Sequence, residues 1–242
     1  MIHSARLIVL HTIKYTESSL LIVAYTDLFG RQTYILRGVR KAKNHAAVHF
    51  FPLNMLEAEV YQKKGVSIQH IKEFQAKNSL QGIRTDLYKG VIALFLGEVL
   101  YKTIKEEEPN APLYQFLSDA IQELDTLLEG VANFHLYFLT QLCAFLGYAP
   151  NNNYHPNDTP LFDIPQGSFV SMGAASDFAF SPQESMLLYR FNTAPNASTA
   201  AAIPLSAIQR NLYIEAIIRY LSFHLNSPFE LKSPGVLRQM FG

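Results

Sequence analysis

The sequence predicts an α+β protein in which a small β-barrel, residues 1–79, is followed by a helical domain, residues 80–242. The first part holds five short runs rich in Val, Ile, Leu, Tyr and Thr, which suit half-buried strands. The second part changes to apolar residues that recur every three or four positions, the spacing of amphipathic helices. With 242 residues and 49% hydrophobic composition, the chain can bury at least one full core.

Short connections join most of the strand-like runs. Glycines within residues 27–31 and 62–66 suit tight hairpins, whereas the connection over residues 40–51 is much longer. The runs are, in order, ARLIVLHTIKY, SSLLIVAYTD, RQTYILRGVR, LNMLEAEVYQ and VSIQHIKEFQAK. Five strands in about 75 residues predict a small barrel, either SH3-like or an OB-fold. Strand length and basic residues favour the OB-fold, which binds single strands through one sheet face and its loops.

The helical part has an irregular insertion at residues 149–180. Prolines, asparagines and a hairpin pattern, LFDIPQGSFV, interrupt the helical spacing there. Helices resume at Ser181, which begins a capping box with Pro182 at the first helical position and Glu184 as its partner. We therefore expect a helical bundle that carries a small hairpin insertion.

The charges of the chain are divided between its two parts, although the formal net charge is zero. Residues 1–80 contain 11 Lys and Arg against 5 Asp and Glu, a balance of +6, and residues 81–242 contain 9 against 15, a balance of −6. The surplus is densest in LRGVRKAKNHAAVHFFPLN, residues 36–54, where four cations occur without an acidic residue. Such an asymmetry indicates an anionic partner, either nucleic acid or a membrane surface.

An OB-fold would place several cations at the borders of one sheet face. Each Lys or Arg that meets a phosphate releases a counterion, which favours binding without reading a sequence. Tyr25, Phe29 and Tyr34 are candidates for base stacking at roughly 1–3 kcal/mol per base, with ordinary barrel core as the alternative for each. The predicted DNA-binding residues are Lys14, Arg31, Tyr34, Arg37, Arg40, Lys41, Lys43, Lys63 and Lys64.

The sequence contains none of the catalytic and cofactor motifs that we sought. It has no Gly-rich phosphate loop, no G-x-S-x-G and no H-E-x-x-H. Cys143 lies in an apolar helical pattern, which favours a buried thiol, and His45 and His49 have no carboxylate nearby in the sequence. We expect neither an enzyme nor a cofactor or metal. Because no apolar run reaches the ~18–20 residues that span a bilayer, we expect a cytoplasmic protein without a membrane partner.

Short motifs follow one another in a fixed order along nearly the whole chain. The opening strands carry Tyr15, Glu17, Gly30, Gly38, Arg40 and Lys43. Later pieces are PLNMLEAEVYQKKGVSIQHIKE, the EPN turn at 108–110, LGYAP at 146–150, FSP at 180–182 and the terminal RYLSFHLNSPFELKSPGVLRQM. In their order and spacing, these pieces resemble the RecO family of bacterial DNA repair and recombination proteins.

The resemblance implies an OB-fold, a helical domain and an ATP-independent activity. Members bind single- and double-stranded DNA, anneal complementary strands and help a recombinase load on DNA coated by single-strand-binding protein. The implied partners are the RecR protein and the acidic, Phe-ended C-terminal tail of single-strand-binding protein, which is taken by a cation-rimmed apolar pocket of the helical domain. The cations available there are Arg210, Arg219, Lys232 and Arg238.

One departure from the family concerns the segment after LGYAP. Many members place two Cys pairs there to bind zinc, whereas this chain has no cysteine in the segment and His155 cannot replace four ligands. We expect a hairpin and side-chain packing to hold the insertion together. The alternative to a DNA-binding mediator is an OB-fold adaptor that binds proteins and has no intrinsic DNA binding.

Overall fold

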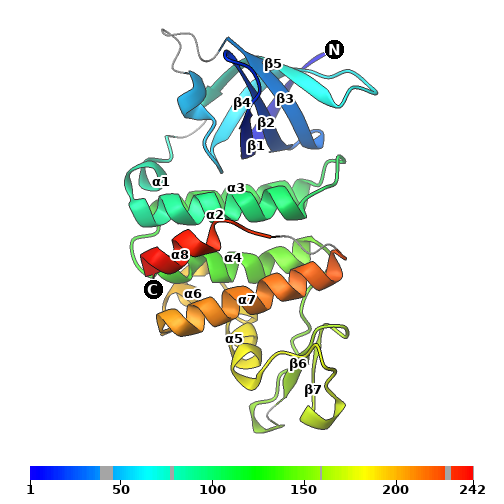
Figure 1. Ribbon diagram of the computed structural model, residues 1–242, viewed down its shortest axis with the longest axis vertical. Helices are drawn as coiled ribbons and strands as arrows, with labels where there is room; N and C mark the ends of the chain where they lie inside the picture. Colours follow the sequence, from blue (N-terminus) through cyan, green and yellow to red (C-terminus); the bar gives the residue numbers. More distant parts are fainter. Residues whose placement is uncertain (39–45, 77–78, 159, 227–229, 242) are drawn as a thin grey trace. The chain divides into compact units, whose positions relative to one another are not determined.

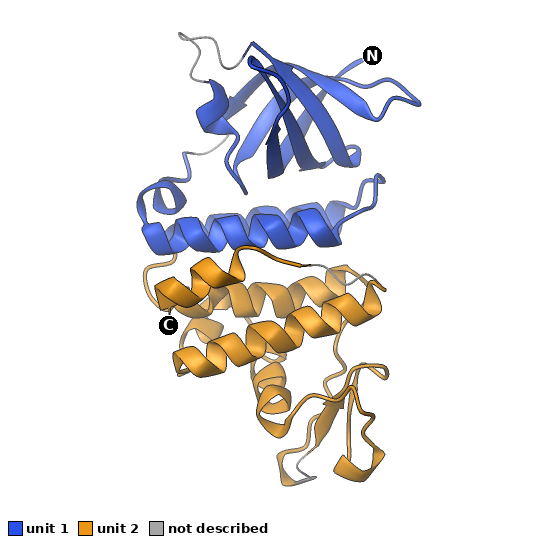
Figure 2. Cartoon of the chain, viewed as in Figure 1, with its two compact units in different colours: residues 1–126 blue, residues 127–242 orange. Residues whose placement is uncertain are grey.

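A computed structural model describes residues 1–38, 46–76, 79–158, 160–226 and 230–241. The predicted DNA-binding residues Arg40, Lys41 and Lys43 lie outside this described part. The chain divides into two compact units, Met1–Thr126 and Leu127–Gly242, which are coloured separately in Figure 2. Each unit is described by itself below.

The first unit contains a closed five-stranded barrel, as the sequence predicts (Figure 1). Its strands are β1 (Ile2–Lys14), β2 (Ser19–Thr26), β3 (Gly30–Arg37), β4 (Met55–Tyr61) and β5 (Ile68–Ala76). They close in the order β1-β2-β3-β5-β4, with β3 and β5 parallel and all other pairs antiparallel. The long connection between β3 and β4 contains a short 3-10 helix, η1 (Ala46–His49). This architecture is OB-like and confirms the predicted fold class.

Alternation along the strands separates the barrel interior from its outer surface. Interior positions include Ala5 and Leu7 of β1, Ile22 of β2 and Leu56 of β4, all of which are buried in one apolar cluster. Their neighbours along each strand face outward, because successive strand residues point to opposite sides. A bulge in β1 between Val9 and His11 adds one residue and turns His11 to the outer side.

Three helices complete the first unit: α1 (Gln81–Thr85), α2 (Leu87–Thr103) and α3 (Ala111–Thr126). Asp86 begins α2, because its carboxylate accepts hydrogen bonds from the backbone N–H groups of Tyr88 and Lys89. Helix α2 packs against β1 so closely that a Cβ on Gly97 would lie 3.2 Å from the carbonyl oxygen of Leu10. The helix therefore covers part of the outer surface of the barrel.

The second unit is helical, with α4 (Val131–Phe145), α5 (Pro182–Asn192), α6 (Ala197–Ala201), α7 (Ala207–His224) and α8 (Pro234–Phe241). The predicted capping box is present at α5, where the Ser181 hydroxyl accepts from the Glu184 N–H at 3.3 Å and the Glu184 carboxylate accepts from the Ser181 N–H at 2.7 Å. Cys143 is buried on α4, and burial raises the pKa of its thiol. A buried, protonated thiol is a core residue rather than a nucleophile.

Residues 149–180 contain the expected hairpin, β6 (Leu161–Asp163) paired with β7 (Ser168–Val170), between the short 3-10 helices η2 (Pro156–Asp158) and η3 (Met172–Ala174). The buried Asp163 carboxylate accepts hydrogen bonds from the N–H groups of Gln166 at 3.1 Å and Ser176 at 2.6 Å. The rings of Phe162 and Phe169 pack edge to face with centroids 5.1 Å apart. Side-chain hydrogen bonds and aromatic packing thus organise this segment.

Candidate nucleic-acid interface

The outer side of β1, β2, β3 and β5 presents two rows of side chains, which together we call the β2–β3 face. Strand register places His11, Val23, Thr33 and Ile68 in one row, and Ile13, Leu21, Ile35 and His70 in the next. Ile13 is 40% exposed and Ile68 is 38% exposed, whereas Val23 and Ile35 between them are buried. The exposed isoleucines thus lie at the edges of these rows, and His11 packs against the Tyr101 ring of α2, with ring centroids 4.6 Å apart.

Two predicted cations lie at one end of the β2–β3 face. Lys14 ends β1 opposite Leu20, and Arg37 ends β3 opposite Ser19, so both side chains lie at the same end of the barrel. Both residues are exposed. Arg40, Lys41 and Lys43, which lie outside the described residues, follow Arg37 within six positions of the sequence. This end of the face can therefore meet phosphate groups.

The other predicted lysines lie in the β4–β5 connection, the turn that leads into β5 (Figure 1). Lys63 and Lys64 are both exposed. Because β5 runs parallel to β3 and begins with Ile68 opposite Thr33, this turn lies toward the start of β3, away from Arg37. The four described cations thus border the β2–β3 face from two directions, as a strand of phosphates crossing the face would require.

Arg31 does not belong to this set, because its guanidinium is already used inside the unit. It donates to the carbonyl oxygen of Tyr101 at 2.7 Å and to that of Ile104 at the end of α2, and it lies 4.9 Å from the centroid of the Tyr101 ring. Burial lowers the pKa of Arg31, although the group remains charged. The residue therefore caps the C-terminal end of α2.

The structure buries most of the aromatic candidates for base stacking. Tyr25 and Tyr34 are both 0% exposed, and Tyr34 belongs to the barrel interior, so neither ring can stack on a base. Phe29 is half-buried, packs on the interior cluster and meets His3 edge to face at 5.3 Å. Tyr15, 56% exposed, is an exposed ring in the turn that follows Lys14. The sequence signal for it was its place in a short turn, where no side chain has to face the barrel interior.

Negative charge borders the turn between β2 and β3. The Arg31 N–H donates to the carbonyl oxygen of Glu106 at 2.9 Å, and a Cβ on Gly30 would overlap the Glu108 carbonyl group. Gly30 also has a positive φ of 60°, so glycine is required there on both counts. The exposed carboxylates of residues 106–108 lie along this edge and repel phosphates from it.

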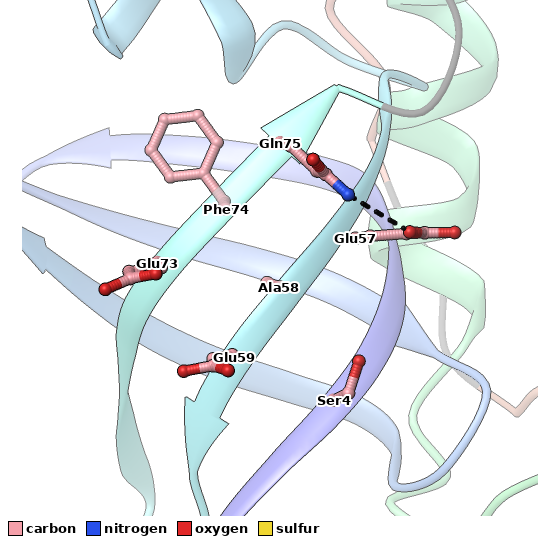
Figure 3. Close-up of a pocket in the computed structure, with 7 residues that line it drawn as sticks. All are labelled: Ser4, Glu57, Ala58, Glu59, Glu73, Phe74 and Gln75. Carbon is pink, nitrogen blue, oxygen red and sulfur yellow. Dashed lines mark hydrogen bonds between the residues drawn. The ribbon is translucent and has the colours of Figure 1, made fainter.

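The outer side of β4 and β5, with the start of β1, is acidic; we call it the β4–β5 face. Register aligns Ser4 with Glu59 and Glu73, and Arg6 with Glu57 and Gln75. These carboxylates line a hollow of about 290 Å³. The Gln75 amide donates to Glu57 at 3.4 Å, and Figure 3 shows this contact beside Ser4 and the other carboxylates. Lys72 pairs with Glu59 at 2.7 Å. Carboxylates therefore outnumber cations on this face, where Arg6 and Lys72 are each paired with a carboxylate.

The cations predicted for a partner tail in the helical unit mostly have acceptors of their own. Arg210 donates to the carbonyl oxygens of Leu205 and Phe241, each at 2.9 Å. Arg219 pairs with Glu184 at 3.2 Å and lies over the Phe180 ring at 5.3 Å, and Arg238 pairs with Glu215. Lys232 is exposed. Arg210 and Arg219 are nine residues apart on α7, about 13 Å along its axis and on opposite sides of the helix.

No group of three or more His, Cys, Asp or Glu side chains able to hold a metal ion occurs among the residues that the structure describes. Within the same residues, no helix is long and apolar enough to cross a membrane. A groove of about 540 Å³ lies beside the LGYAP segment and is lined by Tyr148, Pro150, Tyr220 and His224 among others. Its His224 Nε2 lies 2.9 Å from the carbonyl oxygen of Ile164, within hydrogen-bonding distance.

Comparison with known proteins agrees with the fold along the chain. Residues 1–80 match the family model "Recombination protein O N terminal", and residues 84–233 match "Recombination protein O C terminal". DNA repair protein RecO of Bacteroides fragilis is 35% identical over 237 residues, which cover 97% of each chain. RecO of Christiangramia forsetii is 31% identical over 245 residues, covering both chains completely. RecO of Flavobacterium johnsoniae is 30% identical, with 97% of each chain covered. The chain belongs to the RecO family of DNA repair and recombination proteins.

Proposed function

We propose that the chain binds single- and double-stranded DNA through the β2–β3 face and acts as an ATP-independent mediator of DNA repair and homologous recombination. The observation that carries this proposal is the separation of charge on the barrel. Exposed cations border an apolar face, whereas carboxylates occupy the β4–β5 face. Phosphates are attracted to the first and repelled by the second, so DNA has one preferred path across the barrel.

The proposed chemistry is strand annealing without a covalent step. Lys and Arg side chains neutralise phosphates on one strand, which lets a second polyanion approach and pair with it. The same bound state would assist recombinase loading on DNA coated by single-strand-binding protein. As in the family that the sequence resembles, the RecR protein is the proposed partner in that step.

A salt titration tests DNA binding directly. Fluorescence anisotropy of a labelled oligonucleotide would report affinity at 50 and 200 mM salt, in single- and double-stranded form. With about six phosphate contacts, affinity should fall by about a thousandfold over this range. Arg37→Ala should weaken binding at every salt concentration, whereas Arg84→Ala on α1, a matched loss of one exposed arginine, should not. Affinity that is equal at the two salt concentrations would refute the proposal.

The same titration separates the mediator from a protein-binding adaptor. An adaptor would show negligible DNA affinity even at 50 mM salt, and charge reversal of Lys14 and Arg37 would change only the recovery of protein partners. A mediator would lose DNA affinity with the same charge reversal. The two functions therefore predict opposite results from one variant.

We further propose that the acidic, Phe-ended tail of single-strand-binding protein docks near Arg219 in the helical unit. Phe178 is 58% exposed, Phe223 is 42% exposed, and their ring centroids are 5.8 Å apart. Arg219 and Phe223 are four residues apart on α7 and so share one side of the helix. These exposed rings beside a cation suit a peptide that ends in a phenylalanine carboxylate.

Anisotropy of a labelled acidic peptide ending in Phe would test this site. Arg219→Ala should weaken binding by about tenfold, the effect of one lost charge-assisted hydrogen bond, while Arg190→Ala on α5 should leave the affinity unchanged. Circular dichroism should confirm that α5 remains folded when Glu184 loses its partner. Equal affinities for the two variants would place the tail elsewhere.

A further inference from the structure

The turn that carries Lys63 and Lys64 is held from inside the barrel by one buried side chain. Gln69, the second residue of β5, is 2% exposed. Its Oε1 accepts from the N–H of Lys63 at 3.0 Å, and its Nε2 donates to the carbonyl oxygens of Lys63 and Val66, each at 2.8 Å. One amide therefore binds both backbone polar groups of Lys63 and closes the turn at Val66.

These contacts require an amide of this length. A side-chain amide supplies an acceptor and two donors on one rigid group, which Lys, Arg, Asp, Glu, Ser and Thr do not. Leaving a buried polar group without its partner costs about 1–3 kcal/mol, and the Gln69 amide is buried, so its pairing with the turn is favoured. At the neighbouring position, the Gln62 N–H donates to the Met1 carbonyl oxygen at 3.0 Å, which anchors the start of the same connection.

The backbone of this turn is consequently arranged before any ligand arrives. Gly65 has a φ of 76°, in the left-handed region, and open space surrounds the position of its missing Cβ. Lys63 and Lys64 precede this bend and are both exposed, while the anchoring amide lies in the barrel interior. Binding loses less conformational freedom when the backbone beneath two charged side chains is already ordered.

We propose that Gln69 is a positioning residue for DNA binding, which acts by holding the backbone of Lys63 so that Lys63 and Lys64 face the phosphates at this border of the β2–β3 face. The inference rests on the proposed DNA-binding function and deepens it. Gln69 itself, being buried, does not touch DNA. Its effect passes entirely through the two lysines.

A double-mutant cycle in the full-length chain tests this coupling. The four proteins are the wild type, Gln69→Met, Lys63→Ala/Lys64→Ala and the triple variant, measured by anisotropy on a single-stranded oligonucleotide. Removing two phosphate contacts should weaken binding by about 25-fold at 0.1 M salt and lower the salt slope by about 1.4. Gln69→Met keeps both lysines and the side-chain length. Its DNA affinity should nevertheless fall by at least about fivefold, the loss expected for one phosphate contact, and its salt slope should be lower.

In the lysine-free background, Gln69→Met should cause no further loss of DNA affinity. A merely structural role would instead reduce affinity equally in both backgrounds and would overturn the proposal. A change of less than twofold in DNA affinity when Gln69→Met is made in the wild type would also overturn it. If the wild type itself does not bind DNA at 50 mM salt, the proposed function fails and this inference fails with it; normal DNA binding by the lysine double variant would refute this inference alone.

A second variant covers the case in which Gln69→Met does not fold. Insertion of two glycines after Gly65 lengthens the turn while leaving the barrel interior unchanged. The insertion variant should show a lower DNA affinity and a lower salt slope, as we expect for Gln69→Met, because Lys63 and Lys64 are again no longer held in place. Unchanged affinity in a folded insertion variant would overturn the proposal.

Discussion

The guanidinium of Arg31 lies 4.9 Å from the ring centroid of Tyr101 and donates to the Tyr101 carbonyl oxygen at 2.7 Å. A residue at the start of β3 thereby caps the end of α2, seventy positions later in the chain. The contact joins barrel and helices within the first unit. It also gives the Arg31 guanidinium hydrogen-bond acceptors inside the unit.

Arg31→Met should therefore affect stability more than DNA binding. The variant loses charge-assisted hydrogen bonds to the end of α2, so the free energy of unfolding should fall by about 2 kcal/mol. Urea denaturation followed by circular dichroism would measure the loss. Arg37→Met provides the control, because it should weaken DNA binding with little change in stability. The opposite pattern for this pair would contradict the assignment of Arg31.

Tyr15 should contribute to single-stranded binding by stacking on a base. Tyr15→Ala should lower the affinity for single-stranded DNA by about 1–3 kcal/mol, the range for one stacked base. Duplex DNA should be affected less, because its bases are already stacked on one another. Tyr88→Ala, which removes another exposed tyrosine on α2, is the matched control for both substrates. Equal losses on the two substrates would argue against stacking.

The acidic β4–β5 face should oppose DNA binding. Changing Glu57, Glu59 and Glu73 to Gln removes three negative charges while keeping side-chain size, so DNA affinity at 50 mM salt should rise severalfold. The gain should shrink at 200 mM salt, because the screening length falls to about 8 Å near physiological ionic strength. Anisotropy at both concentrations would measure it. Weaker binding by this variant would show instead that the acidic face takes part in the DNA complex.

Asp163 should make the stability of the helical unit depend on acidic pH. Burial alone would raise the pKa of its carboxyl, but hydrogen bonds from Ser176 and Gln166 outweigh burial and lower the pKa below its ordinary value. The folded state thus binds this proton more weakly than the unfolded state. The stabilisation is present above the unfolded pKa of about 4 and is lost as pH falls through the lower folded pKa.

Denaturation of Asp163→Asn at several pH values would test this dependence. At pH 7 the variant should lose about 1–2 kcal/mol, because a neutral amide accepts hydrogen bonds less strongly than a carboxylate. Its stability should also decline less than that of the wild type on acidification. Parallel pH profiles for the two proteins would exclude Asp163 as the source.

Local patterns predicted much of this architecture. The five runs became five strands, because β-branched and aromatic residues alternate there with a period of two. Ser181 and Glu184 formed their capping box, since the hydrogen bonds of that motif join residues three apart. Residues 161–170 formed the expected hairpin for the same local reason.

Local sequence patterns predicted less of the candidate interface. Lys14, Arg37, Lys63 and Lys64 are exposed, as charged residues at strand ends usually are. Tyr34 and Arg31 were misplaced, because the sequence does not tell which side of a strand faces inward or which distant carbonyl groups lie near a cation. The grouping of Glu57, Glu59 and Glu73 required the register between β4 and β5.

By itself, therefore, the sequence determined the strands, the helix starts, the division of charge between the two parts and the family resemblance. These depend on neighbouring residues, on composition or on the order of motifs. Only the tertiary structure decided the closing order of the barrel and the burial of Tyr34. It also decided the hydrogen bonds of Arg31 to the end of α2 and those of Gln69 to the turn that carries Lys63 and Lys64. Those contacts depend on which segments lie next to one another in space. Strand pairing and helix packing, which involve the whole folded chain, determine those neighbours.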